Sequence, residues 1–166
     1  MKRRSIKHLK PRLNSNYNQG YYHPVNEEKY IGSKPIIYRS GWEYEFSKYC
    51  DITPDVIHWS SEPIGIRYWN LVTKKFHTYF PDYVIRVERN GIIEGYLVEV
   101  KPKAQLHKPK PPKKQTIKTL QRYKKATQTY VVNLCKIEAL NKFAKANGYK
   151  VLIITEDSKI IKGGRS

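Results

Sequence analysis

The dipeptide Asn90-Gly91 separates two runs rich in aromatic and β-branched residues, 76–87 and 92–100. Asn-Gly is the preferred pair for a two-residue type I′ turn, because both turn positions need positive φ angles. The sequence therefore predicts an antiparallel hairpin in which Arg89 faces Ile92. This constrains the chain to folds in which the two runs are neighbouring strands of one sheet.

Counting outward from the turn places Asp82 directly opposite Glu99, with Cβ atoms roughly 4.5–5.5 Å apart. Side chains alternate along a strand, so Lys101 projects on the same face as Glu99. Facing carboxylates repel each other, and a divalent cation such as Mg²⁺ or Mn²⁺, which prefers oxygen ligands, gives a reason to keep them. The register thus predicts a metal site with a lysine beside it. The alternative is a solvated edge hairpin in which Lys101 forms a salt bridge with an acid.

A helix and a further strand are predicted before the hairpin. Ser40 is a suitable N-cap, and Glu43 three positions later completes a capping box. Aromatic residues then recur on one helical face over 39–50, and Pro54 requires the helix to have ended. The range 63–69 reads as a strand, which forms a three-stranded antiparallel meander with the two hairpin strands.

The chain after the hairpin begins with a Pro- and Lys-rich segment at 102–114. Helical patterns follow at 116–127 and again from Asn133, a possible cap, to Gly148. An apolar strand at 149–155 comes next. Because this is a strand–helix–strand return to one sheet, the last strand should run parallel to its neighbour. We therefore expect an α/β fold with a mixed sheet and flanking helices.

Charge points to a polyanionic partner. The chain has 32 Lys and Arg against 14 Asp and Glu, a formal net charge of +18, which attracts nucleic acid. Residues 1–12 and 101–125 contain basic residues and no acid. The residues predicted to contact DNA are Arg3, Arg4, Lys103, Lys108, Lys110, Lys113 and Lys114. The alternatives are a soluble lysine-rich linker and, for the whole chain, a basic ribosomal or packaging protein.

The sequence does not indicate a membrane-spanning protein or a disulfide-bonded protein. No apolar run approaches the roughly 18–20 residues that cross a bilayer, and no apolar stretch follows the basic N-terminus, so neither a span nor a signal peptide is expected. The two cysteines, Cys50 and Cys135, are expected to be free thiols.

Pro81-Asp82, followed after 16 residues by Glu99-Val100-Lys101, resembles the signature of the PD-(D/E)XK nucleases. The resemblance implies a restriction-endonuclease-like core and metal-dependent hydrolysis of DNA phosphodiester bonds, as an endonuclease or exonuclease, with Asp82, Glu99 and Lys101 as catalytic residues. The superfamily also carries an acid on the preceding helix. Glu43 matches it as a catalytic residue and third metal ligand, with Glu45 or a purely capping role as alternatives.

Other short matches to the signature are Pro54-Asp55, Glu27-Glu28-Lys29 and Asp157-Ser158-Lys159. They fall in a predicted turn, an irregular region and the polar tail. Only the set containing Asp82 and Glu99 occurs on adjacent predicted strands in matching register.

Three segments are similar to the TnsA-type branch of transposon end-cleaving subunits: Arg39-Ser40-Gly41-Trp42-Glu43, Thr53-Pro54-Asp55-Val56 and Ser61-Glu62-Pro63-Ile64. Many of those chains have Gln-Pro where this one has Glu62-Pro63. Glu62 is therefore read either as a residue that supports the metal ligands or as a plain surface glutamate.

The size and the basic tails resemble the head-completion nucleases of T-even-type phages. This implies double-stranded DNA as substrate, phage head or portal proteins as partners, and location in the host cytoplasm or the virion. The expected organisation is a basic arm at 1–35, a nuclease domain at 36–155 and a polar tail at 156–166. The competing functions are a transposon end-cleavage subunit and a non-catalytic DNA-binding assembly protein with a degenerate nuclease fold.

Overall fold

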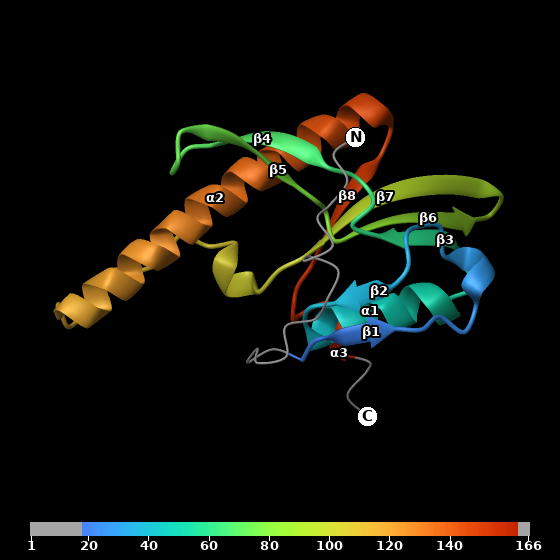
Figure 1. The fold of residues 1–166 in the computed structure, drawn as a ribbon, viewed down its shortest axis with the longest axis horizontal. Coiled ribbons are helices and arrows are strands. Elements are labelled where there is room, and N and C mark those ends of the chain that lie inside the picture. The colour runs from blue at the N-terminus through green and yellow to red at the C-terminus, as the bar shows by residue number, and fades with distance from the viewer. Residues whose placement is uncertain (1–17, 163–166) are drawn as a thin grey trace.

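The computed structural model describes residues 18–162, and its centre is a four-stranded sheet in the order β3-β6-β7-β8 (Figure 1). The strands are β3 (Val56–Ser61), β6 (Tyr83–Arg89), β7 (Ile92–Val100) and β8 (Lys150–Ile154). Strands β3, β6 and β7 are antiparallel, and β8 runs parallel to β7. The predicted α/β fold with a mixed sheet and a parallel return strand is confirmed.

Helices cover both faces of this sheet (Figure 1). On one face, α1 (Gly41–Ile52) contributes Phe46 to a core that also contains Val98 of β7. On the other, α2 (Ile117–Asn147) contributes Leu140 to a second core that contains Leu97. The neighbours Leu97 and Val98 enter different cores because side chains alternate along a strand.

The β6–β7 hairpin has the predicted register. Asn90 and Gly91 have φ angles of 53° and 75°, as a type I′ turn requires. Arg89 pairs with Ile92, and the pairing continues without a bulge to Tyr83 and Val98.

The predicted long strand at 76–87 is wrong, because it is two strands in different sheets. Strand β5 (Lys75–Tyr79) pairs with β4 (Ile66–Asn70) in a separate two-stranded sheet, and β6 begins only at Tyr83. Pro81 lies in the break and has no N–H to continue a ladder. The antiparallel partner on the other side of β6 is consequently β3, and not the predicted strand at 63–69.

The second half of the chain contains one long helix where two were expected. Helix α2 starts after a Thr116 capping box and ends at Gly148, which has a φ of 72°. No proline or glycine interrupts residues 117–147, so the helix continues through Asn133. That residue is buried inside the helix and does not cap it.

The described part of the predicted arm packs on the domain. Strand β1 (Gly20–Tyr22) pairs with β2 (Ile36–Tyr38), and a 3₁₀ turn, η2 (Glu27–Lys29), lies between them. Buried Asp51 of α1 accepts hydrogen bonds from Tyr22 Oη and from the backbone N–H groups of Val25 and Asn26. Residues 20–26 are thereby attached to α1. Arg3 and Arg4 lie outside the described residues.

The predicted polar tail contains a short helix, α3 (Lys159–Lys162), whose Ile160 packs against the core beneath α1. Residues 163–166 lie outside the described part. Both cysteines are free and buried. None of the helices within residues 18–162 has the length and apolarity needed to cross a bilayer.

Candidate active site

Asp82, Glu99 and Lys101 meet where β6 begins and β7 ends. Asp82 directly precedes β6, whose first residue, Tyr83, pairs with Val98. Asp82 itself lies outside this ladder, but its Oδ2 accepts a hydrogen bond from the backbone N–H of Val100, the residue after Glu99. The predicted position directly opposite Glu99 stays a prediction. The strand end is held by the return strand, since Lys101 N–H donates to the carbonyl of Ile154 at 2.8 Å.

Glu99 is a buried carboxylate with one unused oxygen. Its Oε1 forms an ion pair with Lys101 Nζ at 2.8 Å, and the side chains of Glu99 and Lys101 are only 5% and 19% exposed. Its Oε2 is buried and has no hydrogen-bond partner. A buried polar oxygen without a partner is costly, so it indicates a position for a bound partner.

Asp82 lies in a negative environment. Val100 N–H donates to its Oδ2 at 2.6 Å, yet burial and then the charges of Glu99 and Glu43 raise the pKa of Asp82 well above its usual range. Burial would lower the pKa of Lys101, but Glu99 and Asp82 outweigh it and raise the pKa. Lys101 therefore stays protonated at neutral pH as the main positive charge facing the carboxylates.

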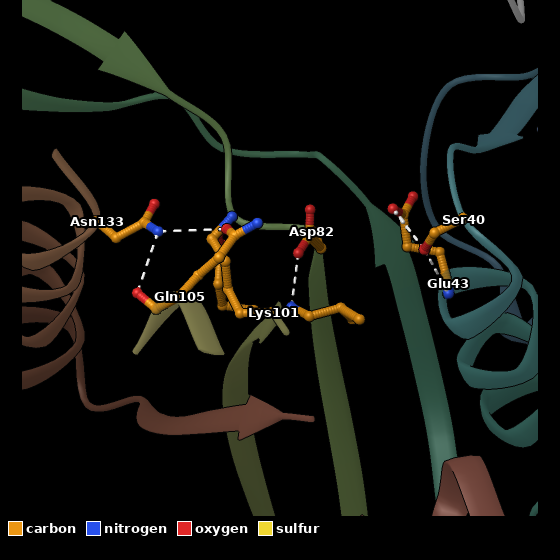
Figure 2. Close-up of polar contacts among 8 residues, drawn as sticks. Ser40, Glu43, Asp82, Lys101, Gln105 and Asn133 are labelled. Carbon is orange, nitrogen blue, oxygen red and sulfur yellow. Dashed lines mark hydrogen bonds and ion pairs between the residues drawn. The ribbon is translucent and has the colours of Figure 1, made fainter. Parts of the chain in front are cut away.

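Glu43 reaches the site from α1, on the opposite side of Asp82 from α2 (Figure 2). Its N–H donates to Ser40 Oγ at 3.2 Å, and its carboxylate accepts from Arg39 N at 2.9 Å and Ser40 Oγ at 3.1 Å. The capping function is therefore real. Glu43 also acts on the site electrostatically, because it raises the pKa of Asp82. Burial is the main cause that raises the pKa of Glu43 itself.

A divalent cation fits Asp82 and Glu99. Within residues 18–162, no three His, Cys, Asp or Glu side chains are gathered closely enough to form a complete ligand set. Mg²⁺ commonly binds one or two carboxylates and completes its shell with water and substrate phosphate. Two facing acids, one with an unused oxygen, match that pattern. The carboxylate oxygens of Glu43 are bonded at its own helix N-terminus, so its role as a third ligand stays a prediction.

Glu62 lies next to these acids. Its N–H donates to the carbonyl of Asp82 at 2.9 Å, and its Oε2 is 3.9 Å from Arg39 Nη2. Its charge raises the pKa of Glu43. Glu62 therefore connects the segment before β6 with the start of α1, where a supporting residue would be placed.

The predicted DNA-binding lysines follow β7 on the connection to α2. Lys103 N–H donates to Glu156, and its Nζ pairs with Asp157 Oδ2 at 2.9 Å. The remaining lysines of the set are exposed: Lys108, Lys110, Lys113 and Lys114. Their contact with DNA stays a prediction.

The competing motif copies form ion pairs at the surface. Asp55 pairs with Arg89 at 3.1 Å, and Glu27 pairs with Lys34 at 2.7 Å. Asp157 pairs with Lys103. Each acid therefore has a local structural explanation.

Two residues of α2 adjoin the site although the sequence did not single them out for it. Asn133 Nδ2 lies 3.4 Å from Gln105 Oε1, which connects α2 to the segment after Lys101 (Figure 2). Lys136 Nζ lies 5.5 Å from the centroid of the Tyr79 ring. Burial and then the charge of Lys101 lower the pKa of Lys136. Helical periodicity gave no signal for either, because their position depends on how α2 crosses the sheet.

Comparisons with known proteins agree with this geometry. The family model described as TnsA-like endonuclease N terminal matches residues 53–156, a range that contains Asp82, Glu99 and Lys101. The head completion nuclease of Enterobacteria phage T4 is similar to this chain, with 34% identity over 139 residues. That alignment covers 83% of this chain and 91% of the phage protein.

Proposed function

This chain belongs to the TnsA-like endonuclease family, and we propose that it hydrolyses DNA phosphodiester bonds with the help of a divalent metal ion. One observation carries the metal requirement. Glu99 keeps a buried oxygen without a partner, opposite a second carboxylate, beside a protonated lysine. Without a cation, this arrangement holds facing negative charges together at a cost.

Asp82 and Glu99 would hold the ion, Mg²⁺ or Mn²⁺, through their carboxylate oxygens. When bound, such an ion supplies positive charge at the scissile phosphate and lowers the pKa of a neighbouring water molecule. Asp82 is oriented for this by Val100 N–H, which fixes its Oδ2. Glu43 would add negative charge from the side of α1.

Lys101 would act on the phosphate. Its ammonium group is fixed by Glu99 and kept protonated by the surrounding carboxylates. A fixed cation stabilises the extra negative charge that develops on the phosphate as it becomes five-coordinate. The same ammonium group can also hold the attacking hydroxide in place.

We further propose that the biological role is head completion in a phage, where the enzyme acts on packaged DNA before head and tail are joined. The similarity to the phage T4 protein over 91% of that chain supports this role. Under this proposal, double-stranded DNA is the substrate, head or portal proteins are the partners, and the protein acts in the host cytoplasm or in the virion.

A transposon end-cleavage subunit is the second candidate, favoured by the family model over 53–156. Such a subunit would need a transposase partner. Rapid cleavage of plasmid DNA by the purified chain alone would favour the phage role, and cleavage only with a recombinase added would favour the second.

Supercoiled plasmid and end-labelled linear duplex test the chemistry, each with Mg²⁺ or with excess chelator. We expect cleavage only with metal, and a loss of about 10²–10³-fold in Lys101→Met, as is typical when one charge-stabilising donor is removed. Lys150→Met is the matched control, because Lys150 pairs with Glu94 on β7, away from the site. Cleavage that survives chelation, or equal rates for the two variants, would contradict the proposal.

A further inference from the structure

The first half of α2 extends beyond the sheet and carries charge of one sign. In Figure 1 this part of the helix projects away from the body of the molecule. Residues 100–137 contain no Asp or Glu, so every charged side chain at the start of α2 is basic. An isolated basic helix segment of this kind repels itself, and a polyanion would relieve that repulsion.

The basic residues are aligned along the helix. Lys118, Arg122 and Lys125 are separated by four and three positions, and Lys136 follows eleven positions later. At about 3.6 residues per turn, Lys118 and Lys136 are five full turns apart and share one direction. Lys118, Arg122 and Lys125 are all exposed. We call these four residues the α2 stripe.

The α2 stripe faces the same way as the sheet-contacting side of the helix. Leu140 comes four residues after Lys136, on the same face, and it is fully buried in the core that contains Leu97 of β7. The face that packs on the sheet in the second half of α2 is therefore basic where the helix has passed the sheet edge.

The α2 stripe leads into the candidate active site. Lys136 Nζ lies 5.5 Å from the centroid of the ring of Tyr79, which ends β5 three residues before Asp82. A hollow of about 260 Å³ lies on this face of the helix. It is lined by Lys125, Gln128, Thr129, Val132, Asn133 and Lys136. Two cations and three hydrogen-bonding side chains in one hollow suit a phosphate and its sugar.

We propose that the α2 stripe binds the phosphate backbone of duplex DNA on one side of the scissile phosphate. This inference rests on the proposed nuclease function and adds a binding surface to it. At about 1.5 Å rise per residue, Lys118 and Lys136 are about 27 Å apart along the helix. That length corresponds to about eight base pairs at 3.4 Å each.

The test compares two triple variants with equal charge loss on the same helix. The first is Lys118→Gln, Arg122→Gln, Lys125→Gln. The control is Lys124→Gln, Lys142→Gln, Lys145→Gln, whose exposed lysines project away from the stripe. Gln has a helix propensity close to that of Lys and Arg. Binding of a labelled 30-base-pair duplex is measured by fluorescence anisotropy with chelator, over a series of salt concentrations.

We expect the stripe variant to bind about tenfold more weakly at 0.1 M salt, and its slope of log affinity against log salt to fall by about 2–3, because each lost phosphate contact removes about 0.9. The control should change binding less than about threefold. Equal losses in the two variants, or a wild-type protein that does not bind duplex, would overturn the inference.

Two further measurements keep the outcomes distinct. If thermal unfolding shows that the stripe variant does not fold, the single variants at Lys118, Arg122 and Lys125 replace it, and each should lower the slope by about 0.9. Wild-type cleavage with Mg²⁺ is measured on the same duplex. If the stripe variant alone loses binding and the wild type does not cleave, the α2 stripe is supported and the nuclease proposal is refuted. If the wild type cleaves but the stripe and control variants lose binding equally, only the α2 stripe is refuted.

Discussion

Replacing Asp82 with Asn removes one of two facing carboxylates and keeps the shape of the side chain. The oxygen of Asn can still accept the hydrogen bond from Val100 N–H. The substitution therefore isolates the charge. We expect it to abolish metal-dependent cleavage and, without metal, to make the protein more stable than wild type.

The size of the gain follows from Coulomb's law. Two unit charges about 5 Å apart, at an effective dielectric constant of about 20, repel by about 3 kcal/mol. The attraction between Asp82 and Lys101, which the substitution also removes, offsets part of this repulsion. We expect a net increase of about 1–2 kcal/mol in the free energy of unfolding, which raises Tm by about 3–6 °C in a domain of this size.

The stability that Asp82→Asn gains over wild type should increase as the pH rises. The pKa of Asp82 in the folded protein is raised by burial, Glu99 and Glu43, whereas an unfolded Asp titrates near about 3.9. Wild-type stability therefore falls as pH rises from about 4 through the raised folded pKa. Asn does not titrate, so the difference between variant and wild type should vanish below about pH 4 and widen above it.

Urea and thermal unfolding with chelator, at pH 4, 5.5 and 7, measure this difference. Asp55→Asn is the control, because Asp55 forms an exposed ion pair with Arg89 and should change stability by less than about 0.5–1 kcal/mol. An Asp82→Asn protein that is less stable than wild type at pH 7 would show that the paired carboxylates are not under electrostatic strain.

Three more outcomes are expected. Mg²⁺ at tenfold its Kd should stabilise the wild type by about 1.4 kcal/mol and leave Glu99→Gln unchanged in calorimetry; equal shifts would place the ion elsewhere. Asp51→Ala should cost about 3 kcal/mol in urea unfolding, because the buried Tyr22 hydroxyl and the backbone N–H of Val25 both lose their acceptor. Burial alone would raise the pKa of Asp51, but its hydrogen bonds lower it, so this stabilisation should be present above about pH 4 and be lost as pH falls through the lowered folded pKa; a constant effect down to pH 2 would contradict this. Leu140→Ala should cost about 2–5 kcal/mol, because Leu140 is fully buried against the sheet, and a smaller loss would mean that α2 packs loosely.

The hairpin could be predicted because the residues that determine it are neighbours in the sequence. Asn90 and Gly91 adopt positive φ angles that few other residue pairs allow. Once that turn is fixed, the pairing of β6 with β7 follows by counting as far as Tyr83 and Val98, which are the neighbours of Asp82 and Glu99 in the sequence. The chemistry proposed for the site depends on this one register.

Other features were decided by tertiary contacts. The run 76–87 looks like one strand, but Pro81 ends the ladder and the chain changes sheets. Asn133 looks like a helix cap, but α2 contains no breaker, and the Asn133 side chain contacts Gln105 instead. In both places a local propensity was overridden by packing with distant segments.

Counting residues from a turn does not predict that Glu43 and Lys136 lie near the site. Glu43 has a complete local explanation as a capping residue, and its effect on Asp82 appears only once α1 is placed beside β6. Lys136 depends on the direction in which α2 crosses the sheet. Unlike the pairing of two hairpin strands, the contacts between a helix and a sheet follow no residue spacing that can be read from a single sequence.

The return strand β8 has a consequence for biosynthesis. Strand β7 gains its parallel neighbour, and Lys101 gains a backbone acceptor, only from residues 150–154. A growing polypeptide folds from its N-terminal side as the ribosome releases it, but until residue 154 has been translated the end of β7 is an unpaired edge. Incomplete chains therefore lack the strand that holds the end of β7, and the candidate active site can be complete only after translation has passed this point.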